Sequence, residues 1–195
     1  MKRMKKLLTG LLTLGMTLSM MTMTAFAAGP TTGTTEKMPT IDFDVNKTGS
    51  ITIHKYEYNG TDGVTGTGAD NQTPPTGAEP LAGVTFKITK IAELNDYYGT
   101  DAKAFPTVEQ AKTMTSIGTP IVQITDENGE AKFNNLSLGL YLVQETDAPA
   151  QITGKVGDFL VSIPMTNADE DDWLYDVHVY PKNKSTYGGV TLQKK

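Results

Sequence analysis

The segment 173–183, with the sequence WLYDVHVYPKN, places a lysine directly after a proline where a β-strand is expected to end. Alternation along this strand would put Trp173, Tyr175, Val177, Val179 and Asn183 on one face, and Asp176, His178, Tyr180 and Lys182 on the other. Because Pro181 has no N–H to donate, the strand should end there or lie at a sheet edge, which would leave Lys182 beside less constrained backbone. Lys182 is therefore expected to be accessible, and the residues alone favour an ordinary exposed lysine at a strand end.

A second lysine, Lys55, is expected to point into the core. The segment 49–56 (GSITIHKY) alternates cleanly, and Lys55 has the same parity as the core-facing Ile51 and Ile53. A lysine at a strand end can extend its amine to solvent. If the amine is buried, its pKa falls towards neutrality, and a neutral amine is a nucleophile.

Two further polar residues share this inward parity. Glu145 has the parity of Tyr141 and Val143, and burial would favour its protonated form. In a dry core the Lys55 amine could attack the amide carbon of Asn183 while Glu145 polarises the amide oxygen and relays protons. The products would be ammonia and an isopeptide bond, and contact between the groups would supply the effective concentration. The alternative is three unrelated polar residues at strand ends.

The elements that must position these residues are strands. Strands are predicted at 49–56, 81–91, 140–145, 159–164 and 175–180, with a further hairpin of 121–125 and 131–133 around the turn 126–129. Roughly seven short strands favour an all-β, immunoglobulin-like Greek-key sandwich. Thr107 and Gln110 have capping-box spacing after Pro106, which predicts a short helix in an insertion.

The chain divides into four predicted segments. These are a signal peptide (1–27), a Thr/Pro/Gly-rich flexible leader (28–47), the β domain (48–185), and a linker with the first strand of a following, truncated domain (186–195). The last assignment depends on residues 188–194 (GGVTLQK), which echo residues 49–55 (GSITIHK). A chance match of two amphipathic strands is the alternative.

Composition narrows the function classes. Removing Lys2, Arg3, Lys5 and Lys6 with the signal peptide would change the net charge from −5 to −9, which argues against nucleic acid and anionic membranes as partners. The chain has no cysteine, so an exported domain would need a staple other than a disulfide. We expect no cofactor and no metal, since His54 and His178 are expected to be solvated strand residues and 169–172 a solvated acidic loop.

Several of these segments resemble motifs of sortase-assembled Gram-positive pilins. Residues 173–183 are similar to their pilin motif, 141–149 (YLVQETDAP) to the E-box of pilins and Cna B-type domains, and 80–86 (PLAGVTF) to their second-strand signature. The resemblance covers about residues 48–194 and implies a Cna B-type fold. It also implies that a sortase joins Lys182 to the C-terminal threonine of the next subunit, and that Glu145 assists a Lys55–Asn183 isopeptide bond. No LPxTG-like sorting signal or later domain is found in the chain.

The resemblance implies a structural backbone pilin, secreted to the cell surface and cell wall of a Gram-positive bacterium. Its expected partners are identical subunits joined covalently head to tail and a sortase, with ancillary pilins or a host surface ligand as further candidates. No enzymatic activity is expected beyond the single self-cross-linking reaction. The alternatives are an ancillary pilin or adhesin stalk, and a secreted enzyme with an unrecognised catalytic set.

Overall fold

The computed structural model describes residues 41–42, 44, 46–57, 66–98, 101–169 and 172–185. For Thr153 and for residues 182–185 the description covers the backbone alone. The predicted signal peptide, most of the leader and the segment 186–195 lie outside the described residues. Among the described residues, no helix has the length and apolar character needed to span a membrane.

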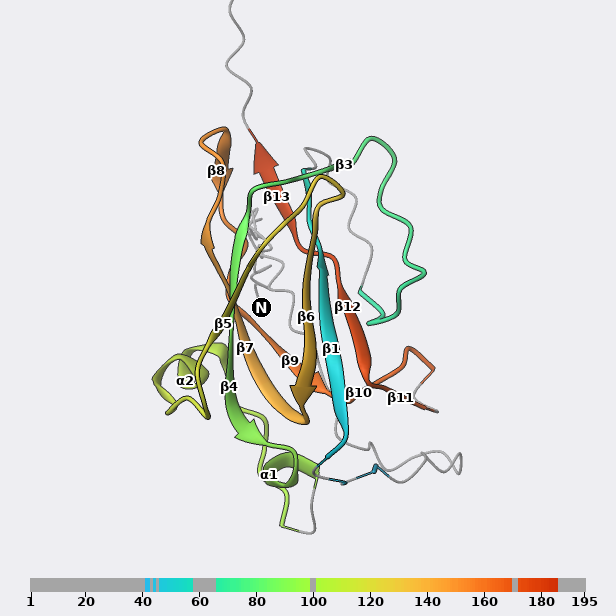
Figure 1. Ribbon diagram of the computed structural model, residues 1–195, viewed down its shortest axis with the longest axis vertical. Helices are drawn as coiled ribbons and strands as arrows, with labels where there is room; N and C mark the ends of the chain where they lie inside the picture. Colours follow the sequence, from blue (N-terminus) through green and yellow to red (C-terminus); the bar gives the residue numbers. More distant parts are fainter. Residues whose placement is uncertain are drawn as a thin grey trace, which may run out of the picture.

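The described strands form two main layers (Figure 1). One sheet has the order β12-β1-β6, formed by β12 (Asp176–Val179), β1 (Thr48–His54) and β6 (Glu130–Ser137). The other has the order β5-β4-β7-β9, formed by β5 (Ile121–Ile124), β4 (Thr85–Glu93), β7 (Gly139–Asp147) and β9 (Phe159–Ile163). Two short strands, β10 (Met165–Thr166) and β11 (Trp173–Leu174), pair separately.

The first sheet continues into a further set of short strands at the top of the view in Figure 1. Its order is β3-β2-β13-β8, formed by β3 (Glu79–Pro80), β2 (Tyr56–Glu57), β13 (Lys182–Ser185) and β8 (Ile152–Gly154). The strand β2 follows β1 after Lys55, and β13 follows β12 after Tyr180 and Pro181. The strand β1 pairs with β12, and β2 pairs with β13, and both of these pairings are parallel.

One hydrophobic core lies between the two layers. Alternate residues of each sheet enter it and are almost fully buried: Ile51, Ile53, Phe133 and Val177 from the first sheet, and Phe86, Ile88, Val143 and Val161 from the second. Ile41, in the predicted leader, also packs in this core. The arrangement confirms the predicted all-β, immunoglobulin-like sandwich, while its Greek-key connectivity stays a prediction.

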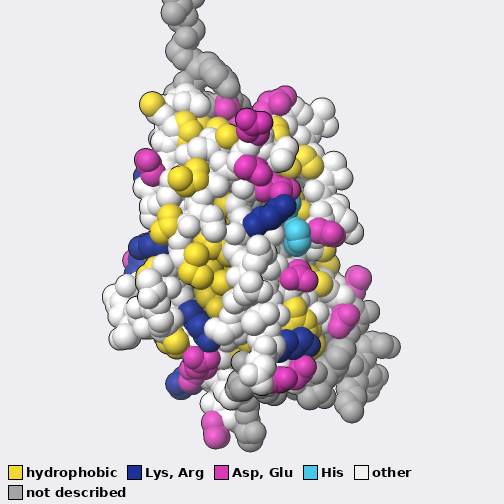
Figure 2. Space-filling view, viewed as in Figure 1, with side chains coloured by type: hydrophobic (Ala, Val, Ile, Leu, Met, Phe, Trp, Pro, Cys, Tyr) yellow, Lys and Arg dark blue, Asp and Glu magenta, His cyan; other side chains and the backbone are white. Residues whose placement is uncertain are grey.

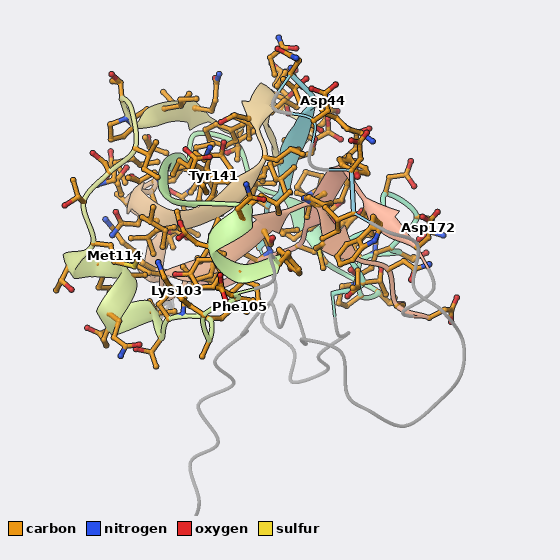
Figure 3. The ribbon with its side chains drawn as sticks, turned by 90° about the horizontal axis from the view of Figure 1, so that it is seen from below. Asp44, Lys103, Phe105, Met114, Tyr141 and Asp172 are labelled. Atoms are coloured by element: carbon orange, nitrogen blue, oxygen red, sulfur yellow. The ribbon has the colours of Figure 1, made fainter. Side chains whose placement is uncertain are left out.

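The predicted helical insertion is present between β4 and β5. It contains α1 (Asn95–Tyr98) and α2 (Val108–Thr113). The capping box forms as expected, since the Thr107 hydroxyl accepts from the Gln110 N–H at 3.2 Å and the Gln110 side chain accepts from the Thr107 N–H at 2.8 Å. Phe105 and Met114, labelled in Figure 3, pack against a second, smaller core that includes Ala111 of α2.

The predicted hairpin over 121–133 is wrong. The turn exists, with the Gly129 N–H donating to the Asp126 carbonyl at 2.9 Å, but β5 pairs with β4 and β6 pairs with β1. Because β5 belongs to the second sheet and β6 to the first, the turn carries the chain from one sheet to the other. The residues of β5 are exposed along its length, whereas Ala131, Phe133 and Leu136 of β6 are buried. The exposed large hydrophobic residues Ile121, Val122 and Ile124 lie on β5, and hydrophobic side chains gather near the middle of the face in Figure 2.

The face expected to carry solvated His54, His178 and Tyr180 is instead partly covered. The His54 Nε2 and His178 Nδ1 atoms are 2.8 Å apart, and the His54 ring stacks on Tyr180 with centroids at 4.6 Å. The Tyr180 hydroxyl donates to the carbonyls of Ala69 and Asp70, so the segment 66–72 packs over this face and Tyr180 is buried. Burial lowers the pKa of His54 below its ordinary value.

Candidate cross-linking site

Lys55 lies at the break between β1 and β2, where its backbone is held from two other segments. Its N–H donates to the Gly129 carbonyl at 2.7 Å, and its carbonyl accepts from the Leu81 N–H at 3.0 Å. Its side chain, following the parity of Ile51 and Ile53, is fully buried. The inward orientation predicted for Lys55 is therefore present, and the alternative of an amine that extends to solvent is not.

The Lys55 amine contacts the carboxyl group of Glu145 inside the core. The Nζ to Oε2 distance is 2.9 Å, and both side chains have 0% exposure. Glu145 Oε2 also accepts from the backbone N–H of Val156 at 3.2 Å, and the Phe86 ring centroid lies 5.5 Å from Nζ. Two of the three residues predicted to react thus meet in an environment shielded from water.

This environment changes the protonation of Lys55. Desolvation lowers the pKa of Lys55 to about 8, although the charge and hydrogen bond of Glu145 act in the opposite direction. At pH 7 a pKa of about 8 leaves roughly one amine in ten neutral, compared with roughly one in three thousand for an ordinary lysine. The site therefore supplies a far larger population of the nucleophilic form.

The third predicted residue, Asn183, lies on the neighbouring strand, where the structure describes its backbone alone. In β13 the Asn183 backbone pairs with Glu57 of β2, and in β12 Val179 pairs with Ile53 of β1. In both ladders the paired residue numbers differ by 126, so one parallel register continues past Lys55. Asn183 is therefore two positions beyond the point that this register places opposite Lys55.

The backbone at Lys182 differs in part from the prediction. The ladder is interrupted at Pro181 and β12 lies at the edge of its sheet, as expected. However, the backbone after the proline is paired, since Lys182 lies opposite Tyr56 in β13 and the following residues pair with β8. Proline removes only its own donor, which allows the ladder to resume at the next residue. The Lys182 side chain lies outside the described part of the chain.

Sequence reasoning missed the residues that hold Lys55 and Glu145. The turn ending at Gly129 was recognised as a turn, but its contact with Lys55 joins segments far apart in the chain. The Val156 N–H has no sequence signal, because any residue other than proline supplies one. Within the described residues, no group of three or more His, Cys, Asp or Glu side chains could hold a metal ion.

The family described as the Gram-positive pilin subunit D1, N-terminal domain, matches residues 46–184. Two similar relatives are the fimbrial subunit type 1 of Actinomyces viscosus, 38% identical over 159 residues, and the fimbrial subunit type 2 of Actinomyces naeslundii, 33% identical over 173 residues. These matches cover 79% and 78% of this chain, and 29% and 32% of the two relatives.

Among solved structures, the full-length major pilin SpaD from Corynebacterium diphtheriae is similar, with a TM-score of 0.59 and 39% identity over 74% of this chain and 33% of that protein. The chain thus spans about a third of the length of each of these relatives. The residues matched by the family include every described strand except the last residue of β13, Ser185. The chain belongs to the Gram-positive pilin subunit family and contains its D1, N-terminal domain.

Proposed function

We propose that the chain supplies the N-terminal domain of a structural subunit in a covalent pilus on the surface of a Gram-positive bacterium. Its family consists of structural pilus subunits and not of enzymes, and the relatives described above are fimbrial or major pilin subunits. After export, a sortase would join identical subunits head to tail. Within each subunit, Lys55 and Asn183 would form an isopeptide bond.

The observation that supports the internal bond most directly is the buried contact between Lys55 and Glu145. Removing an ammonium and a carboxylate from water costs free energy that their mutual attraction often does not recover, so a buried ion pair is weak evidence of a purely stabilising role. Transfer of one proton along the 2.9 Å contact would convert the ammonium and carboxylate into a neutral amine and a neutral acid. These are the two forms that attack on an amide requires.

The proposed reaction balances without an added reagent. The Lys55 Nζ atom attacks the side-chain carbonyl carbon of Asn183, while the protonated Glu145 carboxyl donates a hydrogen bond to the developing oxyanion. Glu145 then carries the proton of the attacking amine to the amide nitrogen, which leaves as ammonia. A new C–N bond replaces the one that breaks, and Glu145 is regenerated.

The bond would provide the covalent staple of a domain without cysteine. It would close a loop of over a hundred residues between strands at the two ends of the domain. In the chain-entropy account, a cross-link of that size stabilises a domain by about 4 to 5 kcal/mol. It would also prevent full extension of the domain when the fibre is pulled.

The bond between subunits is tested by expressing the full-length subunit with its sortase and separating covalent multimers under denaturing conditions. Lys182→Ala should abolish the ladder of multimers but leave the internal bond. Lys182→Arg should also fail, because a guanidinium stays protonated and cannot attack an acyl-enzyme. Lys184→Ala is the matched control, since it removes a lysine from the same strand, and it should polymerise normally. A ladder that persists in both Lys182 variants would contradict the assignment.

A further inference from the structure

The turn between β5 and β6 is closely fitted to the backbone of Lys55. The turn is fastened by Asp126, whose Oδ1 accepts from the N–H groups of Asn128 and Glu130, each at 2.9 Å. It ends at Gly129, whose φ of +74° lies in the left-handed region that favours glycine. The Gly129 carbonyl then accepts the Lys55 N–H at 2.7 Å.

There is no room for a side chain at this glycine. A Cβ atom on Gly129 would lie 2.3 Å from the Lys55 carbonyl oxygen and 3.0 Å from the Leu81 backbone nitrogen. Ordinary van der Waals contact begins at 3.4 Å, so residue 129 and Lys55 would have to separate by about 1 Å. Both of the crowded atoms belong to backbone, which cannot move aside as the end of a flexible side chain can.

We propose that Gly129 is a positioning residue for Lys55: it allows the turn to approach the break between β1 and β2 closely enough to set where the Lys55 amine meets Glu145. This inference rests on the cross-linking function proposed above and adds a residue that takes no part in the chemistry itself. Lys55 lies outside both β1 and β2, so no strand ladder fixes its backbone. Its backbone is held instead by the hydrogen bonds to Gly129 and Leu81, and a shift of the turn would shift Lys55 with it. A misplacement of about 1 Å can slow a reaction between positioned groups by about a hundredfold.

Two other glycines provide matched controls. Gly118 has a similar φ of +77°, but nothing lies within 4 Å of its Cβ position, so Gly118→Ala reproduces the backbone strain alone. Gly49 lies near the start of β1, and a Cβ there would be 2.2 Å from the Tyr175 carbonyl oxygen. Gly49→Ala therefore reproduces the backbone clash at the opposite end of the strand from Lys55.

The first measurement follows loss of ammonia by intact mass after cell-free synthesis of the mature domain. Gly129→Ala should cross-link about a hundredfold more slowly than Gly118→Ala and markedly more slowly than Gly49→Ala, even where Gly49→Ala melts as low. Equal rates in Gly129→Ala and Gly49→Ala at matched melting temperatures would overturn the proposal. If Gly129→Ala does not fold, Asp126→Ala loosens the same turn without adding a side chain and should also cross-link more slowly than Gly49→Ala.

The second measurement does not depend on the cross-link. In an Asn183→Ala background, NMR titration of the Lys55 side chain should give a pKa near 8, because the amine is desolvated. Adding Gly129→Ala should move this pKa towards the ordinary 10.5, whereas adding Gly49→Ala or Gly118→Ala should leave it unchanged. An identical titration in all variants would overturn the positioning role. The two proposals can fail separately. If Gly129→Ala shifts the Lys55 titration but the unsubstituted domain never loses ammonia, the positioning role of Gly129 stands and the cross-link is overturned.

Discussion

The buried amine of Lys55 should make the stability of an uncross-linked domain depend on pH in one direction. In Asn183→Ala the proposed reaction has no amide to attack, so Lys55 stays titratable. Burial lowers the pKa of Lys55 from 10.5 to about 8 in the folded domain. Between these values the unfolded chain binds a proton that the folded domain does not, and the free energy of unfolding rises with pH.

The size of the effect follows from the two pKa values. At pH 7 the folded domain carries nearly the full cost of burying an ammonium group, about 3 kcal/mol. Raising the pH to 9.5 should remove about 2 kcal/mol of this cost. The cross-linked parent should not show this gain, because an amide nitrogen does not titrate in this range.

The assay is urea denaturation from pH 7 to 9.5, followed by the fluorescence of Trp173, the single tryptophan of the chain. The reference is Asn183→Ala combined with Lys55→Met, which replaces the amine with an uncharged side chain of similar length. Burial raises the pKa values of Tyr98 and Tyr141, and their effects at high pH are common to both variants. A difference between the two stability curves that is flat or falls with pH would refute the reasoning.

Two further predictions concern the titratable side chains of Glu145 and His54. Glu145→Ala should fold, but it should lose no ammonia and should melt below the parent. The control Glu93→Ala removes a carboxyl group that is half exposed and should cross-link fully. Loss of ammonia in Glu145→Ala would mean that another group relays the proton. Because the folded-state pKa of His54 is lowered, its contribution to stability should be present above pH 6.5 and decline as the pH falls below it. Urea denaturation at pH 7.5 and 5 should show a smaller loss in His54→Gln than in the parent, and an equal loss would exclude His54 as the source.

The features predicted successfully from the sequence are those set by local pattern. The capping box at Thr107 involves residues three positions apart, and the inward direction of Lys55 follows from the period of its own strand. The features that were missed depend on contacts between distant segments. The sequence 126–129 specifies a turn but not which sheet each flanking strand joins. Likewise, nothing in the sequence near Tyr180 indicates that the segment 66–72 will pack against it.

The same distinction applies to the candidate site. Parity identified Lys55 and Glu145 as inward-facing, but parity cannot show that the Lys55 Nζ and Glu145 Oε2 atoms lie 2.9 Å apart. The fit of Gly129 against Lys55 is likewise a property of the packed domain, and it is visible only once the turn and the strand break lie side by side.

The most direct test of the internal bond is the intact mass of the folded mature domain, followed by sequencing of its proteolytic peptides by mass spectrometry. The account predicts a mass one ammonia below that of the sequence and a branched peptide that joins Lys55 to Asn183. An unmodified mass in well-folded protein, or a branched peptide joining other residues, would contradict it.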